Sequence, residues 1–188
     1  MLKTVIANNC FGGCISNDNA LEFRSPTVNL QILPEEYPKF CANLKHYMDS
    51  ELVEYTDLSE KHKEYCMKMF GWIPDNFPFG LLDDIIVCFQ HYETFAEAKD
   101  CWERRKARMD YDSICYLFHA KNEGYKDAVA EFLALNLPHS AVITEDWGME
   151  GTHPFDVPEG MDCFGSVNGK RLIEQNFSIK KFLEGIEQ

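Results

Sequence analysis

The fold class follows most directly from residues 113–144, which read SICYLFHAKNEGYKDAVAEFLALNLPHSAVIT. Apolar runs over 113–118 and 140–144 predict two strands, and the periodic segment 125–134 between them predicts a helix. A strand, a helix and a second strand in this order form a right-handed crossover between parallel strands. This stretch therefore predicts an α/β domain around a mostly parallel sheet.

The same alternation extends toward the N-terminus. Residues 2–7 predict a first strand, followed by a tight loop over 8–13 with no helix after Gly13. Residues 84–89 are apolar on both faces, which is typical of a central parallel strand. Helices are predicted over 37–48, 59–70 and 94–109, and after Ser178. We predict a single three-layer, Rossmann-like domain over residues 1–188, with an irregular lobe at about 15–78 between the first strand and the central strands.

Size and charge narrow the class of protein. The chain has 188 residues and a formal net charge of −13. Such an acidic surface repels phosphate backbones, so no nucleic-acid partner is expected. No apolar run approaches the roughly 20 residues of a membrane span, and the first residues do not form a signal peptide. We expect a cytoplasmic protein whose eight cysteines are reduced thiols.

Polar residues follow several predicted strands, at the carboxyl ends where open parallel sheets bind ligands. We expect Asn9, His91 and Thr144 to border one cleft at one edge of a single sheet. His91 is the candidate general base because an imidazole titrates near neutral pH, although a structural histidine is an equally good interpretation. The candidate substrate-binding residues are Asn9, Gly12, Gly13, Tyr92, Arg105 and Thr144.

A helical stripe that includes Trp102 and Met109 directs Arg105 toward the core, where a guanidinium requires a carboxylate. Asp83 and Asp84 precede the strand at 84–89, so we predict that one of them pairs with Arg105. Asp84 is also a catalytic candidate, with Mg²⁺ or Mn²⁺ as its ion if the preceding loop folds over the site. The architectural interpretation is favoured, and no set of metal-ligating residues is predicted.

Several short motifs together resemble a known family. They occur in this order: 8–13 (NNCFGG), 25–27 (SPT), the helix 37–44, 80–85 (GLLDDI), 91–92 (HY) and 102–105 (WERR). The set resembles the bacterial domain-of-unknown-function family 1919, commonly labelled exopolysaccharide biosynthesis protein, from the first strand to about Thr144. This chain has Phe11 where the family usually has Trp. The resemblance implies a role in surface-polysaccharide assembly, with a saccharide or other small-molecule substrate and pathway proteins as partners.

Three functions are compatible with these residues. The first is a glycosyltransferase-like enzyme that uses an activated sugar, such as a nucleotide sugar with Mg²⁺ or Mn²⁺, with His91 as the base and Arg105 organising Asp84. The second is a non-catalytic accessory or binding protein of the same pathway. The third is a hydrolase or acyltransferase that uses Cys10 and His91, and a lowered thiol pKa would be its mark.

Overall fold

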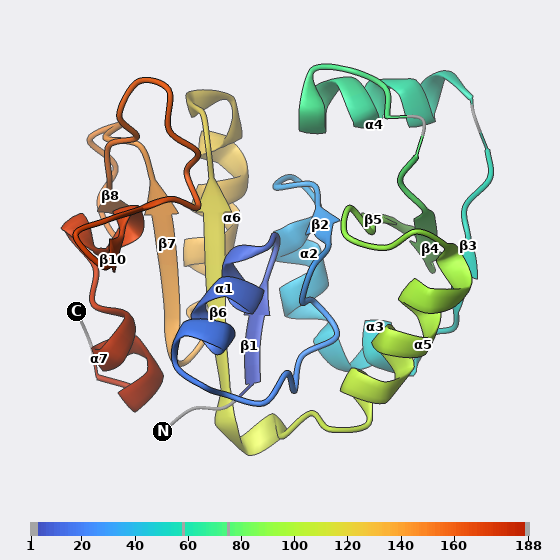
Figure 1. Ribbon diagram of the computed structural model, residues 1–188, viewed down its shortest axis with the longest axis horizontal. Coiled ribbons are helices and arrows are strands. Elements are labelled where there is room, and N and C mark those ends of the chain that lie inside the picture. Colours follow the sequence, from blue (N-terminus) through green and yellow to red (C-terminus); the bar gives the residue numbers. More distant parts are fainter. Residues whose placement is uncertain (1–3, 58, 75, 187–188) are drawn as a thin grey trace.

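The computed structural model describes residues 4–57, 59–74 and 76–186. Its main parallel sheet has the strand order β1-β6-β7-β8 (Figure 1). The strands are β1 (Thr4–Ala7), β6 (Ile114–Ala120), β7 (Ser140–Thr144) and β8 (His153–Pro154), and every neighbouring pair is parallel. The predicted α/β fold around a mostly parallel sheet is confirmed. Leu2 and Lys3, which we included in the first strand, lie outside the described residues.

Helices cover both faces of this sheet. The helices of the described chain are α1 (Phe11–Asp18), α2 (Tyr37–Ala42), α3 (Leu44–Asp49), α4 (Glu60–Phe70), α5 (Phe95–Lys106), α6 (Lys126–Ala134) and α7 (Ile179–Glu184). Of these, α1, α2, α6 and α7 pack against this sheet. Because side chains alternate along a strand, Leu117 of β6 packs with α1 and α7, whereas Phe118 packs with α2 and α6. The sheet and these two helical layers form the three layers predicted from the sequence.

A second, antiparallel sheet lies beside the first and has the order β2-β5-β4-β3 (Figure 1). Its strands are β2 (Gln31–Ile32), β5 (Ile85–Cys88), β4 (Phe79–Leu82) and β3 (Leu52–Glu54). The prediction that 84–89 is a central parallel strand is therefore wrong. The strand is buried on both faces because Ile86 and Cys88 pack in the cluster of α4, while Ile85 and Val87 face the cluster of α2, α3 and α5. Residues 15–78 contribute β2, β3 and three of these helices.

Helix α1 begins at Phe11, where the sequence predicted a loop. The two glycines in its first turn lower helix propensity, but the side chains of Phe11 and Ile15 are fully buried against the sheet. Asn9 Oδ1 also accepts a hydrogen bond from Phe11 N at 3.1 Å and so satisfies one of the N–H groups at the helix start. Gly12 lets the helix lie directly on β1, since a Cβ there would be 3.0 Å from Ala7 Cβ.

Two backbone contacts join the second sheet to the first. Ile32 N donates to Asn8 O at 2.8 Å, so β2 continues from the carboxyl end of β1. Thr27, from the motif 25–27, accepts from Ala7 N on the outer edge of β1 at 3.1 Å. Because β2 pairs with β5, this connection places the end of β5 beside the end of β1.

The remaining elements are short. They are the hairpin of β9 (Ser166–Val167) and β10 (Lys170–Arg171) and the 3₁₀ turns Tyr111–Ser113, Glu123–Tyr125 and Leu172–Gln175. Within the described ranges, no helix combines the length and the apolar composition needed to cross a membrane.

Candidate functional site

Cys10 and His91 meet where the carboxyl ends of β1 and β5 adjoin. Cys10 directly precedes α1, and its Sγ lies 3.1 Å from Nε2 of His91. The side chain of Gln90 also reaches toward this thiol, with Oε1 3.9 Å from Sγ. The two residues are 81 positions apart in sequence and come from different sheets. A thiol and an imidazole within hydrogen-bond distance form the basic unit of cysteine nucleophiles.

The thiol of this pair is protonated at neutral pH. Burial raises the pKa of Cys10 to about 12, and the negative charge of neighbouring Asp162 acts in the same direction. The lowered pKa that would mark a preformed thiolate is therefore absent from Cys10. A protonated Sγ–H can instead donate to Nε2 of His91, which would take the proton as the sulfur attacks.

Asn8 fixes the end of β6 next to this pair. Its Oδ1 accepts from His119 N at 2.9 Å, and its Nδ2 donates to His119 O at 2.9 Å. The buried amide of Asn8 thus takes the place of the backbone groups that would otherwise pair with the N–H and the C=O of His119. It continues the β1–β6 pairing past Ala7. No role was assigned to Asn8 from the sequence.

Asn9 fixes the imidazole of His119. Because Asn9 Oδ1 accepts from Phe11 N, its Nδ2 must be the atom 2.8 Å from His119 Nδ1. An amide nitrogen can only donate, so Nδ1 accepts and the proton of the neutral ring lies on Nε2. Burial, with a smaller contribution from the charge of Lys121, lowers the pKa of His119 to about 3. His119 is therefore a neutral imidazole in one tautomer.

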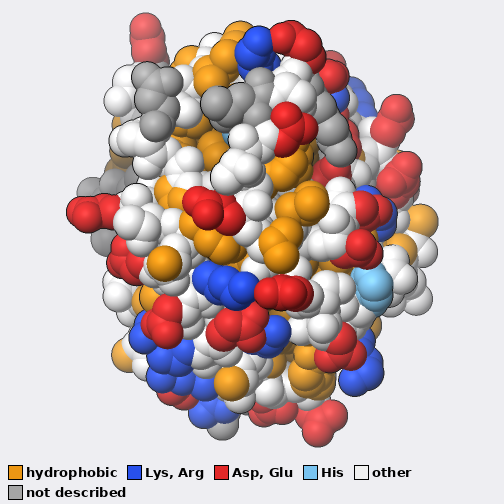
Figure 2. All heavy atoms as spheres, turned by 90° about the vertical axis from the view of Figure 1, so that its right-hand side faces the viewer, with side chains coloured by type: hydrophobic (Ala, Val, Ile, Leu, Met, Phe, Trp, Pro, Cys, Tyr) orange, Lys and Arg blue, Asp and Glu red, His pale blue; other side chains and the backbone are white. Residues whose placement is uncertain are grey.

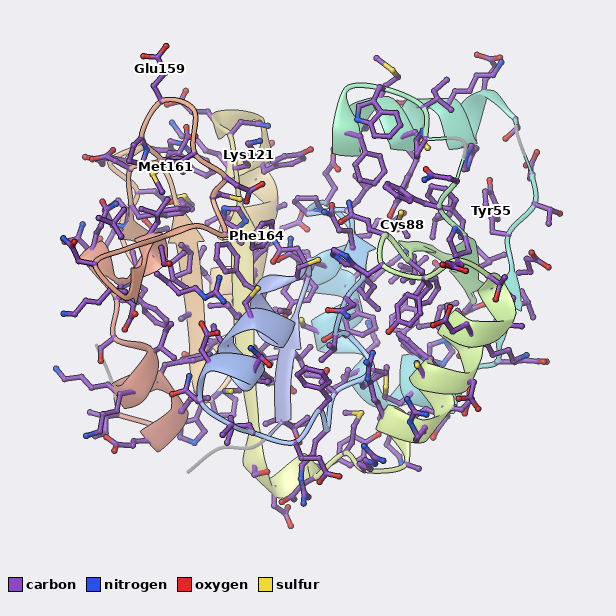
Figure 3. All side chains as sticks on the ribbon, in the orientation of Figure 1. Tyr55, Cys88, Lys121, Glu159, Met161 and Phe164 are labelled. Carbon is purple, nitrogen blue, oxygen red and sulfur yellow. The ribbon has the colours of Figure 1, made fainter. Side chains whose placement is uncertain are left out.

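The segment 156–166 closes over the start of α1. The ring of Phe164 packs on Phe11, with 4.5 Å between the ring centroids, and the ring of Phe11 in turn lies perpendicular to that of His119. Figure 3 shows Phe164 and Lys121 near the upper end of β6, with Cys88 across from them at the end of β5. The ends of β1, β5 and β6 and this segment together surround Cys10.

The predicted edge residues do not all lie together. His91 follows β5 of the antiparallel sheet, so the expectation of a single shared sheet edge is wrong, although the joined sheets bring His91 to Cys10. Thr144 ends β7 as predicted, but it shares a strand face with Val142, which packs in the cluster of α2 and α6. His119 lies on the opposite face, with Phe11. Gly12 and Gly13 lie in the first turn of α1, beside Cys10.

Asp83 and Asp84 form the two-residue turn of the β4–β5 hairpin, at the opposite end of β5 from His91. Asp83 has a φ of 57°, which aspartate tolerates better than most residues. Asp84 accepts from Lys39 Nζ at 3.0 Å and from Tyr47 OH at 2.9 Å, and these bonds lower its pKa. The predicted pairing of this turn with Arg105 is wrong.

Arg105 is buried as predicted, but its partners are neutral. Its guanidinium donates to Val28 O at 3.0 Å and to the hydroxyl of Tyr92, and it lies over the ring of Phe23. A carbonyl, a phenol and an aromatic face therefore replace the expected carboxylate. Other basic residues of the 104–108 segment form exposed ion pairs, such as Arg108 with Glu22, and Figure 2 shows basic side chains next to acidic ones on this face.

We expect Arg105→Ala to lower the free energy of unfolding by about 2 kcal/mol, because it leaves buried polar partners without their charged donor. Arg108→Ala removes only an exposed ion pair and should change it by less than about 1 kcal/mol. Urea unfolding of both variants measures the difference. Equal effects would show that the buried guanidinium contributes nothing specific.

Two surface cavities lie away from Cys10. The larger, of about 610 Å³, is at the amino end of β7 and includes His139, His153 and Phe182. The other, of about 400 Å³, includes Asp18 and Arg171, which form an ion pair. We assign the candidate site to the carboxyl ends because the thiol–imidazole pair lies there. In the described part of the chain, no three His, Cys, Asp or Glu side chains form a metal-binding group.

Comparison with known proteins agrees with the resemblance seen in the sequence. The family model of a domain of unknown function, DUF1919, matches residues 2–148. The chain belongs to this family. An uncharacterized protein of Haemophilus influenzae is 30% identical over 187 residues, which cover 95% of this chain and 83% of that protein. The matched region contains Cys10, His91 and His119, whereas the segment 156–166 lies beyond it.

Proposed function

We propose that the protein is an acyl-transferring or acyl-hydrolysing enzyme in which Cys10 is the nucleophile and His91 the general base. The observation that carries this proposal is the 3.1 Å contact between Sγ and Nε2. It favours the third of the functions considered from the sequence over the other two.

The reaction uses only groups at this site and the two substrates. Cys10 Sγ attacks the acyl carbon, its proton passes to His91 Nε2, and the leaving group departs with that proton. Water, or a hydroxyl of an acceptor, then attacks the thioester, its proton passes through His91 Nε2 to the departing Cys10 Sγ, and the acyl group leaves on the attacking oxygen. Because the Cys10 pKa is about 12, proton transfer to His91 must accompany the attack.

The substrate class rests on the sequence resemblance. We propose that the acyl donor or acceptor is a saccharide of surface-polysaccharide assembly and that the reaction takes place in the cytoplasm. An activated-sugar transferase with Mg²⁺ or Mn²⁺ rests on that resemblance alone, and Asp84, its catalytic candidate, lies at the far end of β5 from His91. Stabilisation by nucleotide sugars in a thermal-shift screen would favour that alternative.

The test is acylation of the full-length protein by p-nitrophenyl acetate. We expect one acetyl group on Cys10, located by peptide mass spectrometry, and none at that position in Cys10→Ala. His91→Gln should slow acetylation by about 10²–10⁴-fold, the usual contribution of a general base. His46→Gln changes an exposed histidine bonded to Asp83 and is the matched control. A wild-type protein that is not acetylated at Cys10 would support the accessory-protein alternative instead.

A further inference from the structure

The tautomer of His119 leaves one hydrogen-bond donor unused at the candidate site. Asn9 occupies Nδ1, so the N–H of the ring is at Nε2, and this atom has no hydrogen-bond partner among the described residues. The residue is only 6% exposed, yet Nε2 is not among the buried polar atoms that are sealed from solvent. The donor is therefore held in an almost fully buried ring without being completely sealed from solvent.

Both chain neighbours of Cys10 contact this ring. Asn9 bonds to Nδ1 at 2.8 Å, and the ring of Phe11 meets the imidazole edge-on at 4.9 Å between centroids. The two hydrogen bonds between the Asn8 amide and the backbone of His119 hold this residue in place at the end of β6. A ring with a fixed position and a fixed proton thus lies against the segment that carries Cys10.

We propose that His119 Nε2–H donates a hydrogen bond to the carbonyl oxygen of the acyl group that Cys10 attacks, an inference that rests on the proposed function. This oxygen becomes negative as the sulfur–carbon bond forms, and a prepositioned donor stabilises that charge. The first backbone bond of α1 is Cys14 N to Cys10 O, so the N–H groups of Gly12 and Gly13 have no acceptor within the helix and can assist.

The two histidines then have separate roles. His91 is exposed, contacts the thiol and takes its proton. His119 stays neutral and keeps its own proton, because Asn9 provides a donor rather than an acceptor at Nδ1. The Asn8-Asn9 pair therefore serves the site by holding His119, and Asn9 is a positioning residue.

The experiment compares two reactions of the same thiol. In acetylation by p-nitrophenyl acetate, the carbonyl oxygen of the ester becomes negative as the thiol attacks. In alkylation by iodoacetamide, the thiol displaces iodide from a carbon and no oxygen becomes negative. We expect His119→Met to slow acetylation of Cys10 by about 100-fold, the typical effect of removing one such donor. Alkylation should stay close to the wild-type rate. His119→Gln has an amide that can accept from Asn9 and donate to the acyl oxygen, so it should recover most of the acetylation rate.

The outcomes separate this inference from the proposed function. Equal losses in acetylation and alkylation in His119→Met would make His119 only a support for the Cys10 segment and would overturn the inference. An unchanged acetylation rate would overturn it as well, with the proposed function intact. A wild-type protein without acetylation at Cys10 would overturn both. Independently, ¹⁵N spectra of the histidine-labelled protein should show His119 protonated at Nε2, and protonation at Nδ1 would refute the donor assignment.

Discussion

Asn8→Ala should lower the free energy of unfolding by about 2–6 kcal/mol, because it leaves a buried N–H and a buried C=O of His119 without partners. Each unsatisfied backbone group costs about 1–3 kcal/mol, and alanine can replace neither bond. The effect can be measured by urea unfolding monitored by circular dichroism. It should exceed that of Arg105→Ala.

The matched control for this variant is Asn19→Ala. Asn19 is exposed and its amide donates to Ile15 O at the end of α1, so its replacement should cost less than about 1 kcal/mol. A stable Asn8→Ala protein would mean that water reaches the end of β6 and replaces the amide.

Stability should also fall as the pH is lowered, and part of that fall belongs to His119. The pKa of His119 is about 3 in the folded protein and about 6.5 in the unfolded chain. Between these values only the unfolded chain binds the proton, so acid favours unfolding, and above pH 6.5 the contribution is constant. From pH 7 to pH 4.5 the loss from this one residue should be about 2–3 kcal/mol.

A comparison of the wild-type protein with His119→Gln separates the contribution of His119 to this loss of stability from that of the carboxylates. Glutamine does not titrate, and the two proteins have the same carboxylates. Unfolding free energies of both proteins at pH 7 and pH 4.5 give the comparison. An equal loss of stability in both would show that the imidazole of His119 is protonated in the folded state.

The elements of the parallel sheet could be predicted from sequence because each has a clear period. Residues 113–144 gave a strand, a helix and a strand, and β6, α6 and β7 lie there. The sequence pattern of a strand does not show which other strand it pairs with. Residues 84–89 are apolar on both faces, and this pattern is the same for a central parallel strand and for β5, which lies between two layers of helices.

The sequence predicted the candidate site only in part, again because a local pattern does not show which strands lie side by side. The carboxyl ends of β1 and β7 were identified through Asn9 and Thr144, but the place of His91 depends on the bond from Ile32 N to Asn8 O, which no local pattern reveals. His119 was left without an assignment because its role depends on Asn9, 110 residues away. The available signals were two consecutive asparagines at one strand end and a histidine at the end of another. Arg105 was correctly placed inside, but its neutral partners come from Tyr92 and Val28.

The distance along the chain between Cys10 and His91 has a consequence for synthesis. A ribosome adds roughly 5–20 residues per second, so the 81 residues between them take about 4–16 s to make. During that time the thiol has been synthesised without its imidazole, and β6, which carries His119, follows later still. The proposed nucleophile therefore acquires its proposed base only after about half of the chain has been translated, and a chain terminated before His91 carries the thiol without that imidazole.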